Sequence, residues 1–261
     1  MYGIHDDSKR YFWAAYHFFV LLSSLVGDTL ILYASFQKDA FKLNKSIVSV
    51  LQHIAVSDLV LSFFTVLPAT ISLLVDSWVL GKTTCYVRLY ITYTAYPAGM
   101  MFIAVMTTNK LLLLKYPQGA SNWAPTGRGT HQICLGIWTL CLLAFPIAFF
   151  MQGQHDVGFD YRGYECGYVF TLPAWRTIMS RIYPIIFQFI PFCIIIGTAI
   201  PTLKYLFHAR KSARRVQGSI PWQGAMTVVL TAGLYCLSNL PLFVYFVGMN
   251  FIEKFPKAHF T

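Results

Sequence analysis

The hydrophobic residues of this 261-residue chain lie in long continuous blocks, and not in the short alternation of a membrane barrel. Each block is long enough to cross roughly 30 Å of hydrocarbon as a helix. Backbone donors and acceptors in lipid must pair within the chain, so helices are the structure that fits. The six predicted membrane-spanning segments are about 11–36, 47–75, 84–114, 133–150, 178–207 and 226–251. The pattern predicts an all-α fold, a polytopic transmembrane helix bundle.

The composition supports a membrane protein. Hydrophobic residues make up 56% of the chain and charged residues only 11%, whereas about 25% of residues are charged in ordinary soluble domains. A soluble protein of this size could not hide so much apolar surface from water. Disorder requires low hydrophobicity, so a disordered chain is excluded as well.

The distribution of charge predicts an orientation. The loops after the first, third and fifth segments hold eleven of the 20 Lys and Arg residues and one acid, Asp39; the other side holds nine, with seven acids. Because basic loops stay in the cytoplasm, we expect a multi-pass membrane protein with its amino terminus outside. Anionic membrane lipid suits the basic face, so the net charge of +10 requires no nucleic-acid partner.

Two of the six cysteines, Cys85 and Cys166, fall outside the predicted membrane interior on the outer side. A disulfide between them is allowed in that oxidising compartment and would hold a loop over the bundle; two unpaired thiols are the alternative. No Cys-x-x-Cys or histidine-rich spacing is present, so we expect no metal site and no cofactor.

An ordered set of motifs resembles the rhodopsin-like (class A) G-protein-coupled receptors. The spacing agrees as well as the residues, since Lys110 follows Cys85 by 25 positions, where the family has its acidic-Arg-Tyr triplet. Cys166 matches the family's partner cysteine. The landmarks are AVSDLVLS (55–62), WVLGKTTC (78–85), NKLLLLKYP (109–117), Trp138, Pro191 and Pro241.

The resemblance implies a seven-helix receptor fold, of which six helices are present in a single domain, 1–261. The chain stops at Thr261 before the Asn-Pro-x-x-Tyr motif of helix seven, and we expect a fragment or a truncated gene model; a real six-helix protein is the alternative. The resemblance also implies a non-enzymatic receptor that transmits an extracellular ligand signal across the plasma membrane to heterotrimeric G proteins, with a disulfide between Cys85 and Cys166.

Two acids lie within the predicted segments. Asp28 replaces the family's asparagine, and Asp58 matches its buried acid. Two close carboxylates do not both ionise readily, so a shared proton or a bound cation would relieve their repulsion. The resemblance implies sodium at Asp58, but Gly99 replaces a frequent serine ligand, which argues against it. The alternative is a protonated pair that holds helices together, and we expect at least one protonated carboxyl at neutral pH.

The resemblance assigns G-protein coupling to Asn109, Lys110, Tyr116 and Pro117. Asn109 replaces the family's acid and Lys110 its arginine, so the planar guanidinium fork is lost. The ionic restraint of the inactive state should be weak, which predicts raised basal activity or poor coupling. The alternative is a lysine that only extends to the interface.

The outer halves of the third, fifth and sixth segments should line a ligand pocket. No acid occupies Thr92, where amine receptors carry their counter-ion, so a biogenic amine is not expected. An aromatic pocket suits a peptide, a lipid or another apolar ligand, although each ring could serve packing alone. The predicted ligand-binding residues are Thr92, Tyr93, Tyr96, Tyr183, Phe187, Phe243 and Phe246, and the predicted hinge residues are Pro191, Asn239 and Pro241.

A membrane transporter or ion channel is the rival function, with Asp28 and Asp58 as a proton or cation relay. We see no inverted repeat that would support it. An enzyme is not expected, because the sequence shows no histidine cluster and no nucleophile–base set.

Overall fold

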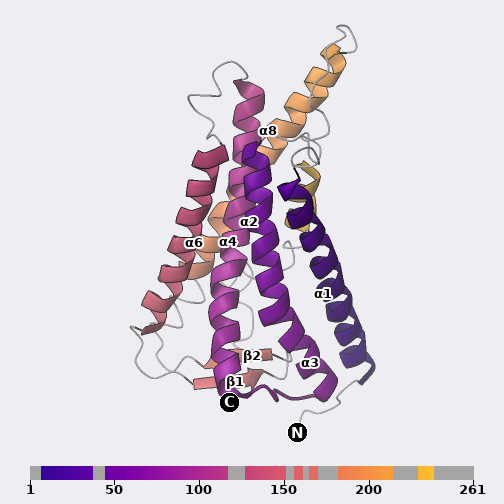
Figure 1. The fold of residues 1–261 in the computed structure, drawn as a ribbon, viewed down its shortest axis with the longest axis vertical. Coiled ribbons are helices and arrows are strands. Elements are labelled where there is room, and N and C mark those ends of the chain that lie inside the picture. Colours follow the sequence, from indigo (N-terminus) through magenta and orange to yellow (C-terminus); the bar gives the residue numbers. More distant parts are fainter. Residues whose placement is uncertain are drawn as a thin grey trace, which may run out of the picture. The chain divides into compact units, whose positions relative to one another are not determined.

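The computed structural model describes residues 7–37, 45–116, 127–150, 156–160, 165–169, 182–213 and 229–237 (Figure 1). Most of them are helical. The elements are α1 (Asp7–Phe36), α2 (Lys45–Leu61), the π-helical turn η1 (Ser62–Val66), α3 (Leu67–Val75), α4 (Gly81–Lys115), α6 (Gly127–Phe150), the strands β1 (Asp156–Asp160) and β2 (Glu165–Val169), a second π-helical turn η3 (Ile185–Phe189) and α8 (Ile190–Ala213). Residues 229–237 form a further helical segment.

The predicted bundle of membrane-length helices is confirmed. Four of its helical stretches are long and apolar enough to cross a membrane: Arg10–Phe36, Lys45–Val75, Gly81–Lys115 and Ile185–His208. Of the predicted sixth segment, 226–251, the described residues are 229–237, and these are helical. Two boundaries differ most: α6 begins at Gly127 and not near 133, and α8 ends at Ala213 and not near 207. A helix can continue beyond the hydrocarbon into the headgroup layer.

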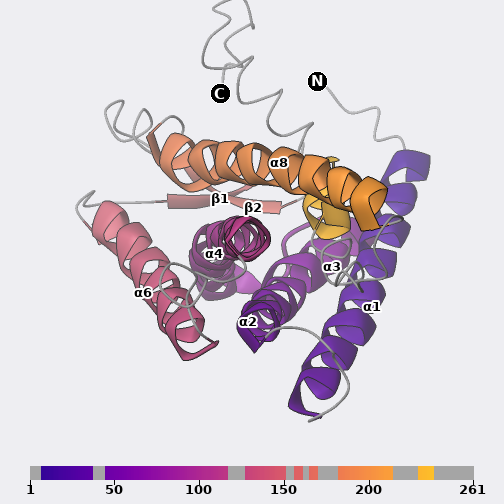
Figure 2. The same ribbon diagram turned by 90° about the horizontal axis from the view of Figure 1, so that it is seen from above.

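The chain divides into two compact units. One consists of Met1–Phe102 with Pro125–Arg176, and the other of Ile103–Ala124 with Thr177–Thr261. In the first unit, α1 packs against α2 and α3, and α2 also packs against α6. Figure 2 shows α2 between α1 and α6. Helix α2 therefore lies at the centre of the first unit, in contact with α1 and with α6.

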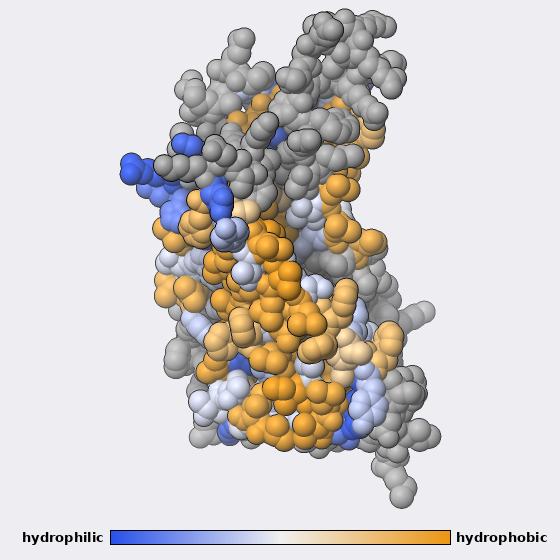
Figure 3. Space-filling view, turned by 45° about the vertical axis from the view of Figure 1, so that its right-hand side comes forward, coloured by the Kyte–Doolittle hydropathy of each residue, from blue (hydrophilic) through white to orange (hydrophobic). Residues whose placement is uncertain are grey.

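Helix α1 buries only a narrow stripe. Its buried residues Ala14, Leu21 and Asp28 are spaced by seven positions, which places them on one face of the helix. Large apolar side chains elsewhere on α1 are exposed, Phe19 to 69%. Orange, hydrophobic side chains cover much of the described surface in Figure 3. An apolar surface of this extent fits contact with lipid and not with water.

Each π-helical turn ends just before a proline. The Leu67 N–H bonds to the Ser62 carbonyl and precedes Pro68, and the Ile190 N–H bonds to the Ile185 carbonyl and precedes Pro191. A proline ring clashes with the carbonyl four residues earlier. The wider turn moves that carbonyl aside, so the helix passes the proline without breaking.

A short antiparallel hairpin, β1–β2, was not predicted from the sequence. Its register pairs Asp156 with Val169 and Phe159 with Cys166. The strands have only five residues each and lie outside the long apolar blocks, so the block pattern contained no signal for them.

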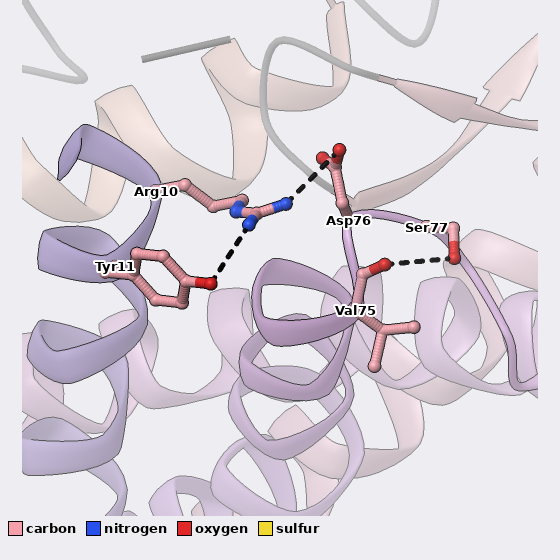
Figure 4. Close-up of polar contacts among 5 residues, drawn as sticks. All are labelled: Arg10, Tyr11, Val75, Asp76 and Ser77. Atoms are coloured by element: carbon pink, nitrogen blue, oxygen red, sulfur yellow. Dashed lines mark hydrogen bonds and ion pairs between the residues drawn. The ribbon is translucent and has the colours of Figure 1, made fainter. Parts of the chain in front are cut away.

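An ion pair joins the first turns of α1 to the end of α3 (Figure 4). Arg10 Nη1 lies 3.2 Å from Asp76 Oδ2, and Arg10 Nη2 donates a 3.3 Å hydrogen bond to the Tyr11 hydroxyl. Asp76 has φ 59°, a left-handed conformation that ends α3 and that Asp adopts more readily than most residues.

The first turns of α2 and α6 are in close contact. Ser46 Oγ and Thr130 Oγ1 are 2.5 Å apart, and both residues are buried. A Cβ added at Gly127 would lie 3.1 Å from the Lys45 Cβ. This distance is too short for ordinary van der Waals contact, so glycine allows the two helices to approach.

We predict that Gly127→Ala lowers the free energy of unfolding by about 1 kcal/mol, because the methyl group forces α2 and α6 apart. Thermal unfolding of the purified protein in detergent measures the change. Gly136→Ala on the same helix is the matched control, since nothing lies within 4 Å of a Cβ there. Equal effects of the two substitutions would contradict the close contact.

Candidate functional site

The predicted disulfide between Cys85 and Cys166 is present and joins the first turns of α4 to strand β2. Both cysteines are buried with Leu89, and the rings of Trp78 and Tyr93 pack against this cluster. The hairpin is thus attached to the start of α4 by a covalent bond inside a small apolar core.

Two hydrogen bonds fix the surroundings of the disulfide. Arg88 is only 3% exposed, and its Nη1 donates a 2.7 Å bond to the Cys166 carbonyl. The Trp78 indole N–H donates a 2.8 Å bond to the Gly81 carbonyl at the start of α4. Gly81 has φ 78°, a conformation that favours glycine. These contacts give local roles to the tryptophan, the glycine and the cysteine of the WVLGKTTC segment.

Three predicted ligand-binding residues, Thr92, Tyr93 and Tyr96, lie half-buried on α4. The Thr92 hydroxyl is 2.9 Å from the Thr65 hydroxyl of η1 and donates to the Arg88 carbonyl at 2.8 Å. Thr92 therefore links two helices through neutral hydroxyl groups, where a cationic ligand would need a carboxylate.

The other predicted ligand-binding residues belong to the second unit. Tyr183 and Phe187 are both buried, and their ring centroids lie 4.6 Å apart, as expected for positions one helical turn apart. Phe243 and Phe246 lie outside the described residues. The structure therefore brings Tyr183 and Phe187 together on one helix, and Thr92 and Tyr93 near the disulfide on another.

Asp28 lies in a chain of hydroxyl contacts. Ser62 Oγ donates to Ser24 Oγ at 2.7 Å, and Ser24 Oγ donates to Asp28 Oδ2 at 2.5 Å. Asp58 is half-buried on α2, within electrostatic range of Asp28. The Asp28 carboxyl is thus held between α1 and η1 by protein groups.

The contact between α2 and α4 at Ser57, next to Asp58 in the sequence, differs from the pattern expected for a sodium site. A Cβ at Gly99 would lie 3.4 Å from Ser57 Oγ, and Ser57 itself donates a 2.8 Å bond to the Ala95 carbonyl. The serine hydroxyl near Gly99 therefore belongs to Ser57 of α2, and it donates to a backbone carbonyl of α4. In the described part of the chain, no three His, Cys, Asp or Glu side chains gather as a metal site.

The predicted coupling residues lie in the last turns of α4. Asn109 and Lys110 are both buried, Lys110 to 7% exposure, and Tyr116 is exposed beyond the helix end. The Lys115 ammonium lies 5.2 Å from the centre of the Tyr116 ring. Pro117 falls outside the described residues, as do the predicted hinge residues Asn239 and Pro241, whereas Pro191 is buried in the first turn of α8.

The sequence analysis missed a histidine pair. His53 of α2 and His131 of α6 approach to 3.0 Å between ring nitrogens, next to Trp138. An ionisable residue inside a predicted membrane segment is a functional candidate by default, and His53 carried that signal.

Comparison with known proteins places these features in a family. The model of the 7 transmembrane receptor (rhodopsin family) matches residues 27–261. Galanin receptor 2a of Danio rerio is 25% identical over 258 residues, which cover 93% of this chain and 65% of that protein. C-C chemokine receptor type 8 of Homo sapiens is 27% identical over 147 residues, covering 56% of this chain and 40% of that receptor.

The chain spans 65% and 40% of the lengths of these two relatives. The family match, in contrast, includes every predicted landmark from Asp28 to Pro241 and most of the chain. This multi-pass membrane protein belongs to the 7 transmembrane receptor (rhodopsin) family.

Proposed function

We propose that this protein is a plasma-membrane receptor that passes an extracellular ligand signal to heterotrimeric G proteins. The observation that carries the proposal is the single 35-residue helix α4. Its first turns hold the disulfide-attached hairpin, and its last turns hold Asn109 and Lys110. At 1.5 Å per residue such a helix is roughly 50 Å long, enough to connect the two sides of a membrane.

The disulfide supports an orientation with the amino terminus outside. Structural disulfides persist in oxidising compartments, so the start of α4 should face the exterior. An exterior start of the third span requires an exterior amino terminus. The excess of basic residues on the opposite loops gives the same orientation.

We propose a peptide-type ligand. The relatives are named as receptors for galanin and for C-C chemokines. The hairpin adds support, because an extended peptide can bind along a strand edge through backbone hydrogen bonds. Thr92, with its hydroxyl bonded to Thr65, supplies no counter-charge for an amine. In this proposal the ligand would contact Thr92, Tyr93 and Tyr96 of the first unit.

Ligand panels test this function directly. We expect cells that express the receptor to activate a G protein, measured by subunit dissociation, after addition of peptides and not of biogenic amines. A response to amines alone would overturn the ligand class. A proton or cation current that persists without G proteins and disappears in Asp28→Asn would favour the transporter alternative.

We predict that Arg88→Met raises the half-maximal concentration of an activating peptide about tenfold. The substitution removes a charged hydrogen bond to the Cys166 carbonyl, worth about 1.5 kcal/mol. The hairpin stays attached to α4 through the disulfide, but its position is less tightly fixed. Concentration–response curves at equal surface expression measure it. Tyr90→Phe is the matched control, because Tyr90 also donates from α4 to a carbonyl, that of Leu142 on α6, away from the hairpin. A similar loss in both variants would argue against a role for the hairpin.

We predict that Asn109→Asp lowers basal signalling about fivefold, equivalent to ~1 kcal/mol. The new carboxylate lies beside the buried Lys110 and would restore an ionic restraint on the inactive state. Asn109→Leu is the control of similar size without charge and should leave basal signalling high. Low basal signalling in the unmodified receptor would contradict the weak restraint.

A further inference from the structure

Three side chains form a continuous hydrogen-bonded chain between α2 and α6. His53 Nε2 lies 3.0 Å from His131 Nδ1, and Trp138 Nε1 lies 3.3 Å from His53 Nδ1. The Phe102 ring of α4 packs on both His53 and Trp138, with centroids 5.5 and 5.6 Å away. His131 is exposed, and His53 is half-buried. The chain therefore runs from a packed aromatic interior to the surface of the first unit.

The donor and acceptor atoms of the three side chains determine which residue donates each hydrogen bond. An indole nitrogen only donates, so His53 Nδ1 must accept from Trp138. A neutral His53 then carries its proton on Nε2 and donates to His131 Nδ1. His131 accordingly carries its proton on Nε2. The single donor Trp138 thus fixes the tautomers of both histidines.

The same logic disfavours a metal ion between the two rings. A metal bound at His53 Nε2 would require the proton on Nδ1, where it would face the Trp138 N–H. The described residues also provide no third ligand nearby. The His53–His131 pair is therefore suited to binding a proton and not a metal ion.

We propose that His53, His131 and Trp138 form a proton-responsive clasp that holds the first half of α6 to α2 and weakens when one proton binds. If the proton enters at His131 Nδ1, that N–H faces the His53 Nε2–H and their bond is lost. If His53 instead shifts its own proton to Nδ1, it can accept from His131 but loses Trp138. A proton added to His53 itself must go to Nδ1, where it faces the Trp138 N–H and removes that bond. One added proton therefore removes one of the two hydrogen bonds, whichever ring receives it.

Among the described residues, the surroundings of the two rings offer no carboxylate that would compensate the added charge. On α6, Arg128 stands one turn before His131 and the thiol of Cys134 one turn after it. On α2, Lys45 begins the helix, Asp58 lies five residues beyond His53, and Gln52 donates to Ser35 of α1 at 3.0 Å. The contact from α4 is the apolar Phe102. Among the described residues, no carboxylate hydrogen-bonds or ion-pairs with either ring. Protonation should therefore loosen the contact between α2 and α6.

The clasp lies in the first half of the membrane-length stretch Lys45–Val75 and in the first half of α6. In the orientation proposed above, this is the cytoplasmic half, so the proton would come from the cytosol. The clasp itself does not depend on that orientation, and its test uses neither signalling nor topology. Its failure would leave the receptor function untouched.

The test measures thermal unfolding of the purified full chain in lipid nanodiscs at about pH 7.5 and about pH 5.5, on either side of the ordinary histidine pKa. His131→Asn places a non-titrating acceptor oxygen near the position of Nδ1. His131→Ala removes the acceptor. His17→Asn is the matched control, because the His17 ring nitrogen bonds to the Trp13 carbonyl and donates whether or not the ring is charged.

We expect acid to lower the unfolding midpoint of the unmodified protein by about 2 to 4 °C more than that of His131→Asn. His131→Ala should start lower at about pH 7.5 and lack this additional loss, and His17→Asn should behave like the unmodified protein. An equal acid effect in His131→Asn and the unmodified protein would overturn the clasp.

Nitrogen NMR of histidine-labelled, unmodified protein provides a second measurement that needs no variant to fold. We expect the His53 proton on Nε2 at neutral pH, with a Trp138 indole resonance that shifts on acidification. A His53 proton on Nδ1 at neutral pH would refute the proposed direction of the chain.

Discussion

Water is absent from the hydrocarbon core of a membrane, so every polar group there must find its partner within the protein. Hydroxyl side chains satisfy this constraint by bonding back to the carbonyl of the preceding turn. The pattern recurs in several helices: Thr70 to Val66, Ser72 to Pro68, Thr94 to Tyr90, Thr139 to Leu135 and Thr202 to Thr198. Such residues add no unsatisfied donor to an apolar segment.

Contacts between helices follow from the same constraint. Lipid tails are as apolar as leucine, so burial alone gives helices little reason to associate, and close packing with polar contacts does more. In the first unit such polar contacts join Ser62 to Ser24 and Ser46 to Thr130. In the second unit Thr198 donates to Thr107 at 2.8 Å. The clasp of His53, His131 and Trp138 is also a polar contact between helices, but its two histidines can change their charge.

The sequence predicts this structure best where a single pattern controls it. Block length located the membrane helices, and the predicted segment 178–207 included Tyr183 and Phe187, whose rings meet one helical turn apart. The start of α6 was predicted too late because residues 127–132 are polar or small although helical. The disulfide was allowed because two cysteines fall outside the predicted membrane interior, and the family resemblance implied their pairing.

Features that depend on a specific partner elsewhere in the chain were harder to predict. A π-helical turn requires a bond to a carbonyl five residues away, and only the following proline hints at it. The hairpin depends on its covalent attachment to α4. His53 and His131 are 78 positions apart, and nothing in the sequence indicates that the two rings pair. Their role emerges only when α2 and α6 meet.

The narrow buried stripe of α1 has a consequence for how this helix tolerates change. Fluid acyl chains reshape themselves around any apolar side chain, so bulky rings such as Phe12, Trp13 and Tyr16 need no fitted cavity. Protein neighbours cannot adapt in that way, and Ala14 and Leu21 occupy spaces of fixed size. Most positions of α1 should therefore tolerate substitution by other apolar residues. The face formed by Ala14, Leu21 and Asp28 should stay nearly constant.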